Sequence, residues 1–80
     1  MSDNGHTALA AALRHLERGD WQAAHKIVQQ DESPAGCWLH GVVHVLEGDL
    51  DNARYWYGRA HRVFSANTAM ELAAAKKSVL

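Results

Sequence analysis

Residues 37–60 have the sequence CWLHGVVHVLEGDLDNARYWYGRA, which predicts two antiparallel helices joined by one tight turn. Gly48 suits the left-handed backbone conformation just past the end of a helix, because glycine has no Cβ to clash there. Asp49 or Asp51 can accept hydrogen bonds from the free N–H groups that open the next helix. The stretch therefore predicts an αα-hairpin.

An internal repeat extends this pattern toward the N-terminus. Residues 18–24, RGDWQAA, match residues 47–53, EGDLDNA, at an offset of 29 residues. The apolar positions before each turn also correspond: Leu9, Leu13 and Leu16 fall on Trp38, Val42 and Val45. The chain is therefore expected to contain two short helical hairpins.

The positions of Gly41, Gly48, Ala53, Tyr57 and Ala60 resemble the tetratricopeptide repeat, in which small residues lie where paired helices touch. The resemblance is strongest over residues 37–60. It implies stacked hairpins and a protein-interaction or assembly module without catalytic activity. The first hairpin departs from the family, because the offset of 29 residues is shorter than the family's period of about 34 and the aromatic residue on its second helix is missing.

Periodicity and capping residues predict five helices in one all-α domain over residues 1–80. Ser33 followed by Pro34 is a strong helix start, and Ser65 or Asn67 can cap the last helix. The predicted architecture is about two stacked antiparallel hairpins plus a C-terminal capping helix. The expected helices cover residues 7–18, 21–30, 34–47 and 50–64, and a stretch after residue 67.

Composition limits the classes of partner. The formal net charge is −1, so the chain has no general attraction for nucleic acid or for an anionic membrane surface. A single cysteine excludes an intrachain disulfide framework and suits a reducing compartment. We expect a cytoplasmic protein, because no basic segment followed by an apolar run predicts a signal peptide.

Cys37, His40 and His44 follow the spacing i, i+3, i+7 and lie near one face of the predicted third helix. Thiolate and imidazole groups are zinc ligands, but a closed site needs about four of them. His25, His61 or carboxylates would have to complete such a site. The favoured interpretation is structural, with the imidazoles packed against the fourth helix and hydrogen-bonded to Tyr57. On that interpretation no cofactor is expected.

Two further groups of residues have a functional and a plain interpretation. Cys37 and His40 could form a thiolate and base, yet neighbouring turns of one helix supply neither a cleft nor an orienting partner, so we expect no enzyme. Arg54, Arg59 and Arg62 form a basic stripe beside Tyr55. This stripe could bind an acidic peptide or phosphate, and an ordinary solvated face is the favoured interpretation.

An apolar surface is the main predicted interaction site. If one face of the third helix meets the fourth helix, Trp38, Val42 and Val45 point the other way, and the repeat adds Leu9, Leu13 and Leu16. Either neighbouring helices fill this surface or a protein partner or second copy covers it, which predicts association such as a homodimer. If the last helix covers these residues, the exposed aromatic Tyr55 is the expected contributor.

Overall fold

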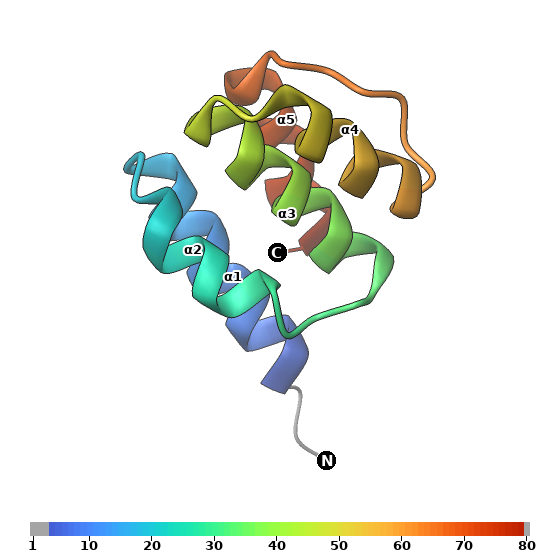
Figure 1. Cartoon of the computed structure of the whole chain (residues 1–80). Coiled ribbons are helices and arrows are strands. Elements are labelled where there is room, and N and C mark those ends of the chain that lie inside the picture. Colours follow the sequence, from blue (N-terminus) through green and yellow to red (C-terminus); the bar gives the residue numbers. More distant parts are fainter. Residues whose placement is uncertain (1–3, 80) are drawn as a thin grey trace.

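The computed structural model describes residues 4–79, so residues 1–3 and 80 of the predicted domain lie outside the described part. Every regular element within that part is a helix, which confirms the predicted all-α class. None of these helices is long and apolar enough to cross a membrane. The elements are α1 (Asn4–Glu17), α2 (Trp21–Val28), α3 (Pro34–Glu47), α4 (Leu50–Arg59) and α5 (Thr68–Val79) (Figure 1).

Both hairpin turns form as the sequence predicts. Gly19 and Gly48 have φ values of 78° and 94°, the left-handed conformation that glycine adopts without a Cβ clash. The aspartates that follow cap the next helices. Asp20 accepts a hydrogen bond from the Ala23 amide at 3.2 Å, and Asp49 accepts one from the Asn52 amide at 3.3 Å. Each repeat of the Gly-Asp pair thus ends one helix and starts another.

Side chains also cap the starts of α3 and α5. The Ser33 hydroxyl accepts a hydrogen bond from the Gly36 amide at 3.1 Å, and Pro34 occupies the first position of α3. The Asn67 side chain accepts one from the Met70 amide at 3.2 Å, which begins α5. The predicted capping roles of Ser33 and Asn67 are confirmed.

The fourth helix is shorter than the predicted range of residues 50–64. It ends at Arg59, because His61 adopts a φ of 60° and the chain leaves the helical path. Two backbone bonds close this end: the Arg62 amide donates to the Tyr57 carbonyl at 3.0 Å, and the His61 amide donates to the Gly58 carbonyl at 3.1 Å. Phe64 still packs near Tyr57, with ring centroids 5.3 Å apart, but it does so from the connecting segment.

The helices pack in the order expected of two stacked hairpins, with α1 against α2, α2 against α3 and α3 against α4. At Gly41, α3 and α4 lie in close contact. A Cβ atom placed there would lie 2.5 Å from Cδ1 of Tyr57 and 3.3 Å from the carbonyl oxygen of Ala53. The predicted role of Gly41 in bringing these two helices together is confirmed.

The last helix covers α1 and α3 on one side of the two hairpins (Figure 1). Its Ala75 and Val79 side chains are buried there. Glu71 links the helix to both members of the second hairpin, because one carboxylate oxygen accepts from the Trp38 indole at 3.0 Å and from the Tyr57 hydroxyl at 2.8 Å. The C-terminal helix therefore closes the side formed by the first helix of each hairpin.

Candidate metal centre

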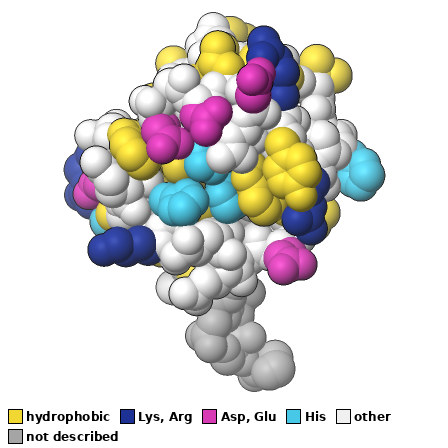
Figure 2. Space-filling view, in the orientation of Figure 1, with side chains coloured by type: hydrophobic (Ala, Val, Ile, Leu, Met, Phe, Trp, Pro, Cys, Tyr) yellow, Lys and Arg dark blue, Asp and Glu magenta, His cyan; other side chains and the backbone are white. Residues whose placement is uncertain are grey.

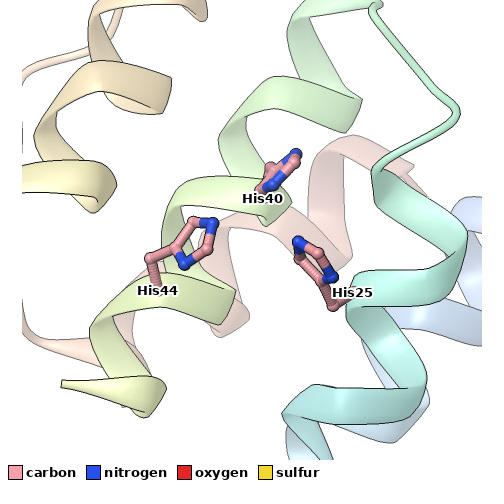
Figure 3. Close-up of side chains that lie close together, drawn as sticks. All are labelled: His25, His40 and His44. Atoms are coloured by element: carbon pink, nitrogen blue, oxygen red, sulfur yellow. The ribbon is translucent and has the colours of Figure 1, made fainter. Parts of the chain in front are cut away.

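Three histidines from two helices meet where α2 packs against α3. His25 comes from α2, and His40 and His44 lie one turn apart on α3. One nitrogen from each imidazole lies within 4.8 Å of the other two. The three side chains approach one another in the space between the two helices (Figure 3). The packing of the two hairpins thus creates a cluster of three nitrogen donors.

The spacing of these donors is close to that of a metal site. Zinc binds imidazole nitrogen at about 2.0–2.1 Å, so two nitrogens on a tetrahedral ion are about 3.3 Å apart. The donors of the cluster lie within 4.8 Å of one another, so a tetrahedral ion would draw them closer together on binding. Three ligands leave one tetrahedral position open, as in catalytic rather than closed structural zinc sites.

The cluster is partly buried and reaches the surface. His40 and His44 are only 5% and 7% exposed, whereas His25 is half-buried. Figure 2 shows histidine side chains near the middle of the visible face, with hydrophobic side chains beside them. An ion can therefore enter from solvent while two of its ligands are held by the surrounding structure.

The environment of His40 favours the neutral form that binds metal. Its ring stacks on Trp56 with centroids 3.8 Å apart and planes inclined by 9°. Burial is the main cause that lowers the pKa of His40 from 6.5 to about 4, and charge repulsion from the nearby His44, His25 and Arg59 contributes the rest of this shift. Near neutral pH this imidazole therefore carries a free lone pair.

A carboxylate adjoins the cluster through His44. Nδ1 of His44 lies 2.7 Å from Oε1 of Glu47, one turn later on α3. Glu47 and the neighbouring Asp49 also form a second group of donors with His44, again within 4.8 Å of one another, although both carboxylates are exposed. The cluster of three histidines is the more buried of the two groups.

The structure corrects one member of the predicted ligand set. Cys37 lies outside the group formed by His25, His40 and His44. Its side chain is buried, its thiol donates a weak hydrogen bond to the Glu32 carbonyl oxygen at 3.7 Å, and burial raises the pKa of this thiol. The Cys37 thiol therefore faces the segment before α3. The third donor of the cluster is His25.

The hydrogen bond expected for the structural interpretation has a different partner. The Tyr57 hydroxyl donates to Glu71 at 2.8 Å and so points toward α5. His40 contacts Trp56, His25 and His44 instead. Trp56 is thus a wall of the cluster. No motif or spacing in the sequence indicated this role for Trp56.

The predicted apolar surface is mostly interior. Val45 is half-buried, and the other five residues of this surface are buried: Leu9, Leu13, Leu16, Trp38 and Val42. Of the two alternatives, neighbouring helices therefore fill the surface, and these five residues are not available to a partner. The physical reason is α5, which covers α1 and α3. Tyr55, expected to contribute in that case, is 56% exposed.

The three arginines of the basic stripe have separate neighbours. Arg54 lies 3.5 Å from Asp51, and Arg59 lies 3.9 Å from Glu32. The Arg62 guanidinium stacks over the Trp38 ring at 3.4 Å. Two of the three charges are therefore paired with carboxylates, and the stripe does not converge on one site.

The histidine cluster predicts a stability loss in acid for the metal-free protein. The folded-state pKa of His40, about 4, is below the unfolded value of about 6.5, so the unfolded chain takes up the proton first. The free energy of unfolding should be highest above pH 6.5 and should fall by up to about 3 kcal/mol as the pH drops to 4. Urea unfolding with a chelator present measures this loss.

The matched variants for this measurement are His40→Gln and His61→Asn. His40→Gln should show a smaller loss between pH 6.5 and pH 4, because the group that takes up the proton on unfolding is gone. His61 is exposed and should leave the pH profile unchanged when it is replaced. Equal acid sensitivity in His40→Gln and the unaltered protein would contradict the burial of a neutral His40.

No known protein family, no curated protein and no solved structure matches the chain. The resemblance to tetratricopeptide repeats therefore stays a prediction.

Proposed function

We propose that this protein binds one divalent transition-metal ion through His25, His40 and His44. The observation that carries the proposal is the convergence of three imidazole nitrogens within 4.8 Å of one another. His40 and His44 are almost fully buried, and contacts with Trp56 and Glu47 hold their rings in the cluster. A bound ion gives all three side chains a favourable role.

The ligand chemistry selects the class of metal. Imidazole nitrogen suits zinc, copper, nickel and cobalt, whereas magnesium and calcium prefer oxygen ligands. The cluster of His25, His40 and His44 offers nitrogen only. We therefore expect Cu²⁺ to bind most tightly among the divalent ions, Zn²⁺ and Ni²⁺ next, and Mg²⁺ and Ca²⁺ not at all at this cluster.

The ion would join the two hairpins. His25 belongs to the first hairpin, and His40 and His44 belong to the second. A domain of this size buries a small core, and metal binding is one of the devices by which small domains gain stability. Binding free energy at a site that exists only in the folded state adds directly to folding free energy.

A Co²⁺ titration tests this proposal. Cobalt takes the place of zinc and absorbs visible light, so chelator-stripped protein should develop absorption bands that saturate at one Co²⁺ per chain. His25→Gln should remove these bands, whereas Cys37→Ser should retain them, because Cys37 lies outside the cluster. Absence of saturable absorption in the unaltered protein would rule the proposal out, and its loss in Cys37→Ser would restore the thiol as a ligand.

A second candidate function is association through α4. Leu50 and Tyr55 on this helix are 40% and 56% exposed, and the Arg59 guanidinium lies 6.0 Å from the centre of the Tyr55 ring. Aromatic and arginine side chains are enriched where proteins bind one another. The sequence predicted a protein partner or a second copy of the chain. We propose that this partner binds at α4 and not at the apolar residues, which are buried.

Light scattering tests self-association at this surface. At micromolar concentration we expect a mass above that of the 8.8 kDa monomer, and Tyr55→Ser should lower it while leaving helicity unchanged, because Tyr55 is exposed. Val63→Ser is the control, since Val63 is 92% exposed but lies outside α4. A monomeric mass at all concentrations would contradict self-association.

A further inference from the structure

The carboxylate of Glu47 lies next to the imidazole of His44, and both residues are on α3. Oε1 of Glu47 is 2.7 Å from Nδ1 of His44, a short distance for a hydrogen bond of this type. The two residues are three positions apart on α3, so the helix itself holds them at this separation. The His44 side chain is 9% exposed and the Glu47 side chain 37%.

The chemistry of this contact decides which nitrogen of His44 is free. An ionised carboxylate only accepts hydrogen bonds, so Nδ1 must carry the proton. A neutral imidazole has one N–H group, and therefore its Nε2 keeps the lone pair. From this geometry we infer that Glu47 is a positioning residue that holds His44 in the Nδ1–H form and makes Nε2 the metal-binding atom. The inference rests on the proposed metal-binding function.

Such a partner strengthens a metal site in two ways. The hydrogen bond orients the imidazole ring before the ion arrives, and the negative charge makes the ligand nitrogen more basic. His40 obtains its orientation differently, from the stack on Trp56. Glu47 therefore orients the His44 ring, as Trp56 orients the His40 ring, and both ligands on α3 are held in place.

The alternative is that Glu47 binds the ion directly. Donor atoms of His44, Glu47 and Asp49 also lie within 4.8 Å of one another. In that arrangement Nδ1 of His44 would turn from the carboxylate to the ion, and the ligand set would contain two oxygens. The two assignments differ in the identity of the metal-binding nitrogen and in the colour of the Co²⁺ complex, so both are measurable.

The first measurement needs no metal. A long-range ¹H–¹⁵N spectrum of chelator-treated protein distinguishes the two neutral forms of each imidazole. We expect His44 in the Nδ1–H form, with Nε2 unprotonated, at a pH where the ring is neutral. In Glu47→Ala this preference should be lost. A His44 ring found in the Nε2–H form in the unaltered protein overturns the inference whether or not the protein binds metal.

The second measurement compares Co²⁺ affinities. Glu47→Ala should bind Co²⁺ about 10–100-fold more weakly than the unaltered protein, and Glu47→Gln should fall between them, because an amide oxygen accepts a weaker hydrogen bond. The shape of the absorption spectrum should stay the same, since the three ligands are unchanged. Asp49→Asn is the matched control: it removes a neighbouring charge while asparagine still caps α4, and it should leave the affinity within about twofold.

The outcomes distinguish failure of metal binding from failure of the role of Glu47. If the unaltered protein binds no Co²⁺, the proposed function fails and the role of Glu47 fails with it. If the protein binds Co²⁺ and Glu47→Ala binds it equally well, only the inference fails. If Glu47→Ala or Asp49→Asn changes the spectrum itself, the carboxylates are direct ligands and the positioning role is overturned. Circular dichroism of each variant confirms that α3 is intact.

Discussion

Replacement of Gly41 by leucine is expected to destabilise the protein by about 3 kcal/mol or more, because α3 and α4 have no room for a side chain at this position. Even a Cβ atom would lie 2.5 Å from Cδ1 and 2.7 Å from Cε1 of Tyr57. The Tyr57 ring cannot move aside easily, since its side chain is fully buried and its hydroxyl donates to Glu71. Urea unfolding followed by circular dichroism measures the loss.

Gly58→Ala is the matched control for this experiment. Gly58 also lies within a helix, but a Cβ atom built on it meets no other atom within 4 Å. Alanine favours a helix interior over glycine by up to about 1 kcal/mol, so Gly58→Ala should stabilise the protein slightly. A gain in stability for Gly41→Leu as well would mean that α3 and α4 are not in close contact at this position.

Saturation with Zn²⁺ is expected to raise the melting temperature of the chelator-treated protein by about 10–20 °C. A ligand that binds only the folded state at 100 times its dissociation constant adds about 2.7 kcal/mol of stability. In a domain of this size each kcal/mol corresponds to about 4–8 °C. The gain should be this large because the ion ties α2 to α3 through ligands on both hairpins.

His25→Gln should remove most of the Zn²⁺-dependent rise and change the metal-free melting temperature little, since His25 is only half-buried. His61→Asn is the control and should keep the full rise, because His61 lies outside the cluster. A rise of equal size in His25→Gln would show that zinc binds elsewhere. No rise in the unaltered protein would leave the three histidines with a packing role alone.

Local structure was predictable from the sequence. The left-handed turns at Gly19 and Gly48 and the caps at Asp20, Ser33 and Asp49 depend on contacts between residues three to five positions apart. The hairpins follow from these turns and from the apolar spacing between them. The predicted end of α4 at residue 64 was wrong. The helix ends at Arg59, because His61 adopts the left-handed backbone conformation although the apolar pattern continues beyond it.

Only the tertiary structure decided which residues share a site. Helical periodicity alone places His40 and His44 side by side. Their contact with His25 depends on how α2 packs across α3, and contacts between residues close in sequence do not determine that packing. The position of α5 was equally undetermined, because a helix whose apolar residues are mostly alanine has no distinct face to direct its packing. In the folded chain α5 lies on α1 and α3, where it buries the residues that periodicity alone left facing outward.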